Sequence, residues 1–205
     1  PIAVERFLRD SRINTIFEGS SEIMRLFIAR EVLDPHLKIG AAVLNTQLSK
    51  NVRLRAALKS AVFYSAWYPQ QWFAGFTNRG VRNTEWDRRL ATHLRYASRT
   101  SHRLARALFH AMARYGPKLE REQVLLGRFV DIGTELFAIV ATCSRAESMG
   151  NTEAIAVASY FCRRARLRIE QLFTGIGRNA DRAGYKLAQQ VLNGDCLWIE
   201  EGMTR

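Results

Sequence analysis

A single carboxylate near the start of the chain stands in a setting that suits proton transfer. Glu18 follows the apolar pair Ile16 and Phe17 and directly precedes Gly19. Partial desolvation by apolar neighbours raises the pKa of a carboxyl group toward the range that a general base needs. A glycine beside it has no side chain, so a ligand or another stretch of backbone can pass close. These residue types indicate a candidate base, although an ordinary acid in front of a helix is the simpler interpretation.

A helix start is expected just after this acid. Ser20 or Ser21 can cap a helix through its hydroxyl group, and Glu22 falls in the first turn, where the helix dipole favours a negative charge. The free N–H groups at such a start can bind a phosphate or polarise a carbonyl. A base, a bare glycine and a helix N-terminus therefore lie together within residues 16–23, IFEGSSEI.

The run around these residues closely resembles the C-terminal signature of the acyl-CoA dehydrogenase family. That signature has an Arg-Asp-x-x-Ile lead, an aromatic-Glu-Gly-Ser/Thr-x-Glu/Gln-Ile centre, and then an Arg and an Ala-Arg pair. The match is ungapped and covers about the first 33 residues. The matching positions are Arg9, Asp10, Ile13, Phe17, Glu18, Gly19, Ser20, Glu22, Ile23, Arg25, Ala29 and Arg30.

The resemblance implies a role for each central residue of the signature. Glu18 would remove the α-proton of an acyl-CoA thioester while a hydride passes from the β-carbon to N5 of FAD, and its N–H would help hold the thioester carbonyl. Gly19 would touch the substrate, and Ser20 and Glu22 would contact FAD. Ser20 departs mildly from the usual threonine and keeps the hydroxyl. Some branches place the base on another helix and carry a small residue here, so Glu18 favours the more common arrangement.

The resemblance also implies partners and a missing part. FAD, an acyl-CoA, an electron-transfer flavoprotein and a homo-oligomer would be expected in the intact enzyme. The flavin-binding β-domain of such enzymes, their N-terminal helical domain and their Gly-Gly-x-Gly loop would lie upstream of Pro1, a start without Met that suggests a fragment or processed piece. Since hydride transfer needs the flavin held against the substrate, we expect this chain alone to bind FAD poorly and to be inactive.

The sequence pattern predicts long helices for the rest of the chain. Prolines number 4 and glycines 13, so few positions can interrupt a helix. Apolar residues at three-and-four spacing predict helices from the serines to Pro35, then over 38–48, 51–68, 84–115, 118–149, 152–174 and 181–192. Pro35 is expected to bend or end its helix, Pro69 to end the helix over 51–68, and residues 69–83 to form a loop.

These helices predict an all-α fold, an antiparallel bundle of long helices. We expect residues 1–48 to be the end of an acyl-CoA dehydrogenase-like catalytic domain and residues 49–205 to be a helical extension domain. By length, helicity and position, that extension is similar in kind to the one in very-long-chain enzymes, which is associated with the membrane surface.

The chain is strongly basic, with a formal net charge of +12. Such a charge suits an anionic lipid surface, phosphate or an acidic protein, or it is only the solvated face of long helices. A non-catalytic domain that docks on a membrane or a protein is therefore the alternative function. No helix-turn-helix, zinc or ribonucleoprotein signature accompanies the charge, so no nucleic-acid partner is expected. The docking hypothesis rests on basic and aromatic residues: Arg79, Arg82, Arg88, Arg89, Arg163, Arg164, Arg166 and Arg168, with Trp67, Trp72, Phe73 and Phe76.

Cysteines and histidines carry little signal. Cys143, Cys162 and Cys196 are widely spaced and odd in number, which argues against a metal site or a disulfide framework and favours a reducing compartment. We expect a cytoplasmic protein, peripheral to a membrane if docking holds, or a mitochondrial one in a eukaryote. The four histidines are expected to be structural or surface residues, and no run of about 20 apolar residues suits a membrane span.

Overall fold

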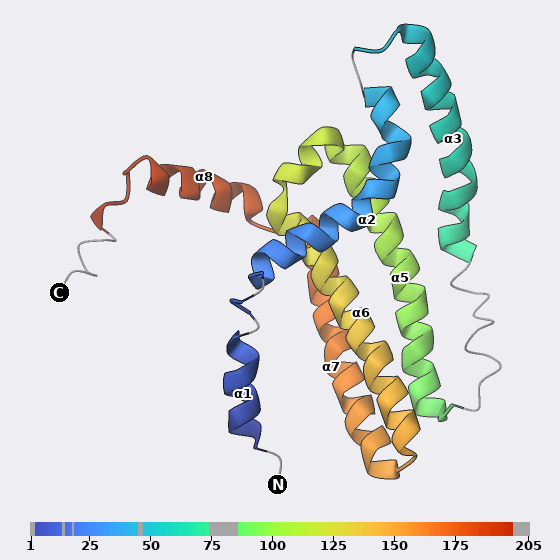
Figure 1. Ribbon diagram of the computed structural model, residues 1–205, viewed down its shortest axis with the longest axis vertical. Helices are drawn as coiled ribbons and strands as arrows, with labels where there is room; N and C mark the ends of the chain where they lie inside the picture. Colours follow the sequence, from blue (N-terminus) through green and yellow to red (C-terminus); the bar gives the residue numbers. More distant parts are fainter. Residues whose placement is uncertain (1–2, 14, 18, 45–46, 74–85, 199–205) are drawn as a thin grey trace.

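The computed structural model describes residues 3–13, 15–17, 19–44, 47–73 and 86–198. All regular elements among these residues are helical, which confirms the predicted all-α class and its antiparallel bundle of long helices (Figure 1). In chain order they are α1 (Val4–Ile13), α2 (Ser21–Leu44), α3 (Lys50–Phe73), α5 (Arg88–Tyr115), the 3₁₀ helix η1 (Gly116–Arg121), α6 (Gln123–Met149), α7 (Thr152–Gly177) and α8 (Asp181–Leu192).

Three long helices, α5, α6 and α7, lie side by side with alternating directions and form the centre of the molecule (Figure 1). A connection of two residues joins α6 to α7. Gly150 ends α6 with a φ of 64°, a left-handed conformation that glycine adopts without strain. Asn151 then caps α7, because its side-chain oxygen accepts the N–H of Ala154 at 2.7 Å. So short a link makes α6 and α7 antiparallel neighbours.

Most of the buried apolar side chains lie between these three helices. Two clusters share the space, one toward the α6–α7 turn and one toward η1. The first contains Leu90, Ile132, Leu136, Ile139, Cys143, Cys162, Ile169 and Phe173. The second contains Leu108, Leu119, Leu125, Leu126, Phe129 and Val130, together with Ala29 and Leu33 from α2. The central bundle therefore has a core of its own, and α2 is packed onto it.

Capping residues set helix ends that apolar spacing alone misplaced. Asp87 accepts the N–H of Arg89 at 2.8 Å, so α5 begins at Arg88 instead of the predicted 84. The predicted helix over 118–149 is divided, because Gly116 has a positive φ of 53° and Pro117 opens the tight turn of η1. α7 extends to Gly177, three residues beyond its predicted end, and α8 has the predicted bounds.

The predictions that Pro69 ends its helix and that a break precedes Lys38 were wrong. Pro35 lies inside α2 and Pro69 inside α3. Figure 1 shows α2 changing direction near its middle, so the helix bends at the place where proline removes a backbone hydrogen bond, but it does not end. The side-chain oxygen of Gln71 lies 2.9 Å from His102, and the backbone oxygen of Gln71 accepts a bond from Arg106. These contacts with α5 keep the chain helical to Phe73. The remainder of the predicted loop, residues 74–83, lies outside the described residues.

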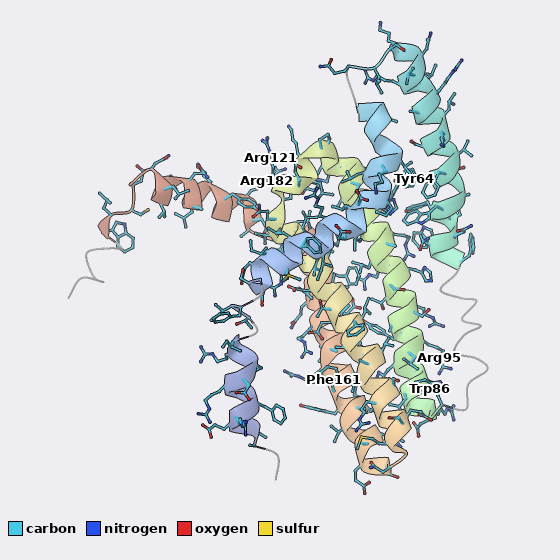
Figure 2. All side chains as sticks on the ribbon, in the orientation of Figure 1. Tyr64, Trp86, Arg95, Arg121, Phe161 and Arg182 are labelled. Atoms are coloured by element: carbon cyan, nitrogen blue, oxygen red, sulfur yellow. The ribbon has the colours of Figure 1, made fainter. Side chains whose placement is uncertain are left out.

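The antiparallel pair α2 and α3 packs on α5 through aromatic rings. Tyr64 lies between the two helices in Figure 2, with its hydroxyl 3.0 Å from Nδ1 of His36. Its ring contacts Phe109 of α5, with centroids 5.0 Å apart. Tyr68 also contacts Phe109, at 5.2 Å. Aromatic packing thus joins α3 to the central bundle.

α1 and α8 lie at the periphery, on the same side of the central bundle in Figure 1. Neither contains a buried residue. α8 is anchored at its first residue, where Arg128 of α6 forms a two-pronged ion pair with Asp181. None of the helices that the structure describes is both long and apolar enough to span a membrane.

Candidate functional site

The signature segment is the link between α1 and α2 together with the first turn of α2. Glu18, the predicted base, lies outside the described residues. Gly19 and Ser20 are half-buried, and Glu22 is exposed in the first turn of α2, where the helix dipole favours its charge. The structure therefore brings Gly19, Ser20 and Glu22 together at the start of one helix, as the sequence predicted.

Gly19 is held in a conformation that other residues avoid. Its φ is 111°, and a Cβ atom built there would lie 2.9 Å from Sδ of Met24. Both facts exclude a side chain at this position without local rearrangement. The glycine of the signature is thus required by the backbone itself, whatever it contacts in a substrate complex.

Backbone hydrogen bonds fix the approach to α2. The N–H of Ser21 donates to the carbonyl of Thr15 at 3.2 Å, which closes the turn around residues 15–21. The carbonyl of Ser20 accepts the N–H of Met24 at 3.0 Å and so begins the helical ladder. Ser20 therefore takes the position of the helix cap.

The second half of the signature packs against the bundle. Arg25 donates from Nε to Asp131 of α6 at 2.7 Å, and Ala29 is buried in the second core cluster with Leu33. These residues orient the first half of α2 on α6. The signature is therefore divided between a half that joins the bundle and a half, residues 16–23, that stands at its edge.

That edge is strongly apolar and open to solvent. Phe17, the aromatic residue of the signature, is 65% exposed, and Ile16, Ile23 and Phe27 are exposed to a similar degree. Large apolar side chains exposed so close together in the sequence are typical of a surface that contacts a ligand, a partner or another part of a longer protein. On the opposite side of α2, Ile28 and Val32 line an apolar hollow of about 370 Å³ whose other walls come from α5 and α6.

Histidines occupy structural places. His36 and His102 lie against Tyr64 and Gln71, as described above, and Nε2 of His110 is 2.8 Å from the hydroxyl of Tyr68. His93 is buried, with Nε2 3.2 Å from Ser159 Oγ. Burial, together with the nearby charges of Arg166 and Arg163, lowers the pKa of His93. Within the described part of the chain, no three histidine, cysteine or acidic residues come together as a metal site would require.

Of the four arginines on α7 that were named for docking, two have partners within the bundle. Arg168 pairs with Glu135 of α6 at 2.6 Å, and Arg166 stacks 4.2 Å above the ring of Tyr96. Arg163 and Arg164 are exposed. Two of the aromatic residues named for docking have other contacts. Trp67 contacts His36 and Phe109, and Trp72 lies under Arg106, so both belong to helix packing. Arg79, Arg82 and Phe76 lie outside the described residues.

Three features of the fold were not predicted from the sequence. The first is α1, whose signal was the pair of ion pairs at four-residue spacing, Arg6 with Asp10 and Glu5 with Arg9. The second is the Arg128–Asp181 pair, which nothing in the sequence marks. The third is the contact between two cysteines, whose signal was their place on the apolar faces of consecutive helices.

This all-α segment, with a Glu-Gly-Ser motif at a helix start, is of the kind found at the C-terminal end of acyl-CoA dehydrogenases, and comparison with known proteins agrees. The family model Acyl-CoA dehydrogenase, C-terminal, bacterial type matches residues 48–193, and Acyl-CoA dehydrogenase, C-terminal domain, matches residues 2–33. The chain belongs to the acyl-CoA dehydrogenase family, as a C-terminal segment of the bacterial type.

Two relatives show the range of similarity. Probable acyl-CoA dehydrogenase FadE10 of Mycobacterium tuberculosis is 43% identical over 210 aligned residues, covering 98% of this chain and 32% of the relative. The human mitochondrial very long-chain specific acyl-CoA dehydrogenase is 30% identical over 156 residues, covering 70% of this chain and 21% of the relative. The chain thus spans about a third of the length of the first of these relatives. No solved structure matches it.

Proposed function

We propose that this chain is the C-terminal part of an FAD-dependent enzyme that introduces an α,β double bond into an acyl-CoA thioester. The observation that carries the proposal is the signature segment: a glycine that the backbone requires, a helix start with a hydroxyl and a carboxylate, and an exposed apolar edge. Membership of the family and the length of the relatives support it.

In this proposal Glu18 is the general base. Its carboxylate takes the α-proton of the thioester, and its own backbone N–H helps to stabilise the negative charge that develops on the thioester carbonyl. Gly19 has no side chain, so the substrate can pass close to the backbone at this position. The division of the chain into a catalytic end, residues 1–48, and a helical extension, residues 49–205, is part of the same proposal.

The cofactor assignment can be tested against the residues present. Ser20, half-buried just before α2, offers a hydroxyl, and Glu22, exposed in the first turn of α2, offers a carboxylate, which fits hydrogen bonding to a polar group that lies outside the chain. FAD, when bound in the longer protein, would supply the hydride acceptor. Ser20 and Glu22 would orient it from one edge, an electron-transfer flavoprotein would be the redox partner, and a homo-oligomer is expected.

Replacing the proposed base in the longer, flavin-containing protein tests this function. We expect Glu18→Gln to lower acyl-CoA-dependent flavin reduction by at least about 100-fold while bound flavin is kept. Glu31→Gln changes another exposed acid on α2 and is the matched control, expected to retain activity. Full activity in Glu18→Gln would refute the assigned base.

A second candidate function, docking on an anionic membrane surface, is favoured by one face of α7. Val157, Tyr160 and Leu167 are exposed there at helical spacing, with Arg163 and Arg164 between them. Apolar side chains bordered by arginine are the pattern of a surface-bound amphipathic helix.

Vesicle sedimentation separates this candidate from a merely solvated face. We expect the chain to sediment with vesicles that contain phosphatidylserine, less so as salt rises, and the double variant Arg163→Glu with Arg164→Glu to lose most of that binding. Equal binding to neutral vesicles, or no effect of the double variant, would exclude docking through this face.

A further inference from the structure

Two cysteines meet inside the α6–α7 hairpin, far from the signature segment. Sγ of Cys143 on α6 lies 3.6 Å from Sγ of Cys162 on α7, and both residues have no exposed surface. Both thiols are free in this structure. The two sulfurs are thus in direct contact, and no step of the proposed function uses either residue.

The surroundings keep the two sulfurs facing each other. Ala146 and Ala158 belong to the same buried cluster, and such small side chains let the α6 and α7 backbones approach closely. The helices are joined by a two-residue link, so this end of the hairpin cannot slide far. A disulfide needs the two sulfurs about 2.05 Å apart, so bonding requires a further approach from this contact.

The two thiols are not equivalent. The hydrogen bond from Cys143 lowers the pKa of Cys162, and the positive charge of Arg166, one helical turn further along α7, acts in the same direction. The same hydrogen bond and burial raise the pKa of Cys143. The thiolate is the reactive form, and Arg166 lies on the same helix as Cys162, four residues further on, where its charge favours a thiolate. Cys162 is therefore the sulfur suited to attack and Cys143 the one suited to resolve.

We propose that Cys143 and Cys162 are an oxidation site that forms an intramolecular disulfide on reaction with a hydroperoxide. The Cys162 thiolate attacks the peroxide oxygen, the O–O bond breaks and an alcohol or water leaves, so that Cys162 becomes a sulfenic acid. The Cys143 sulfur then attacks the Cys162 sulfur, the S–O bond breaks and water leaves. Together the two thiols lose two protons and two electrons, and the peroxide takes them up.

Burial makes this reaction slow. A peroxide must reach sulfurs that have no exposed surface, so the end of the hairpin has to open transiently before Cys162 reacts. The product would be a covalent link across the hairpin, which constrains the unfolded chain and so stabilises the bundle. Cys196, which is partly exposed, would react faster by itself and has to be removed from any test.

The test uses the full 205-residue chain with Cys196→Ser, treated with hydrogen peroxide and then alkylated after denaturation. We expect an intact mass lower by two hydrogens, two fewer alkylated thiols, and a peptide in which Cys143 and Cys162 are joined. Dithiothreitol should reverse all three. The oxidised chain should also unfold at a higher urea concentration than the reduced one.

Matched variants assign the roles of the two sulfurs. Adding Cys143→Ser should leave a sulfenic acid on Cys162 that dimedone traps, whereas adding Cys162→Ser should leave Cys143 largely unmodified. Circular dichroism verifies that each variant is helical, and Cys143→Ala replaces the serine variant if it is not. Two alkylatable thiols after prolonged oxidation of the folded chain, a link between two chains, or sulfinic acid without the disulfide would each overturn the proposal.

Discussion

The α6–α7 hairpin and the signature segment, residues 16–23, differ in how they place their apolar side chains. In the hairpin, Ile132, Ile139 and Ile169 have no exposed surface, so the helices bury their apolar faces against each other and against α5. In the signature segment, Ile16, Phe17 and Ile23 face solvent. The hairpin is well packed and carries no motif. The signature segment carries the motif, and its apolar side chains are not covered by the described part of the chain. The proposed site lies at an edge of the described structure, whereas the buried core lies at its centre.

The largest expected effect tests this contrast in stability directly. Ile139→Ala removes a fully buried side chain from the first core cluster, so the free energy of unfolding should fall by about 2–5 kcal/mol. Ile16→Ala, which removes the same atoms from the exposed edge, should change it by less than about 0.5 kcal/mol. Urea unfolding followed by circular dichroism measures both. Comparable losses would mean that the edge is packed in solution.

A second experiment asks whether α8 depends on the hairpin through a single ion pair. The side chains of Arg128 and Asp181 are only 19% and 13% exposed, and no residue of α8 itself is buried. Arg128→Ala should therefore release α8 at a local cost of about 2 kcal/mol, since it leaves the carboxylate without its charged donor. Amide hydrogen exchange should rise in residues 181–192 and stay slow in α6 and α7.

The pH dependence of α8 gives the same contact a separate readout. Arg128 lowers the pKa of Asp181 below its usual value of 3.8, so the pair contributes stability above that pH and loses it as pH falls through the lower, folded value. Exchange of α8 in the wild type should thus increase only in strong acid. Arg182→Ala, next to Asp181 but exposed, is the control. An equal effect from it would show that α8 is held by charge in general.

A third experiment probes the contact between α5 and α7 by titration. Burial and the charges of Arg166 and Arg163 hold the pKa of His93 below 6.5, so the unfolded chain binds a proton at a pH where the folded one does not. Stability should therefore fall as pH drops below about 6.5, by up to about 1.4 kcal/mol for each pH unit. His93→Gln should reduce this dependence between pH 7 and 5, measured by urea unfolding, and His36, whose pKa burial also lowers, should account for what is left. His110→Gln, on the exposed side of α5, should leave it unchanged.

Sequence predicted the two regions unequally well. The three-and-four spacing of apolar residues, with the capping residues, predicted α7, α8 and most of α5 and α6. Local apolar spacing decides those helices. Pro69 misled, since its effect on α3 is outweighed by contacts between Gln71 and α5 that come from a distant part of the chain. The pattern of the signature predicted the helix start beside Gly19, Ser20 and Glu22, and the roles of these three residues stay predictions. The partners of Arg25 and Arg128 were not predicted, because pairing across helices depends on the packed fold.

The smallest expected effects come from replacing two glycines by alanine, one inside α6 and one beside the proposed base. Gly133 lies inside α6, and an added Cβ would meet nothing within 4 Å, so Gly133→Ala should raise the free energy of unfolding by about 0.5–1 kcal/mol. Gly19→Ala places a Cβ against Met24 at a φ of 111° and should lower it by about 1 kcal/mol. Urea unfolding of both variants and of the wild type gives the two signs. A neutral Gly19→Ala would mean that the turn before α2 has another conformation in solution, and that the backbone does not by itself require a glycine beside the proposed base.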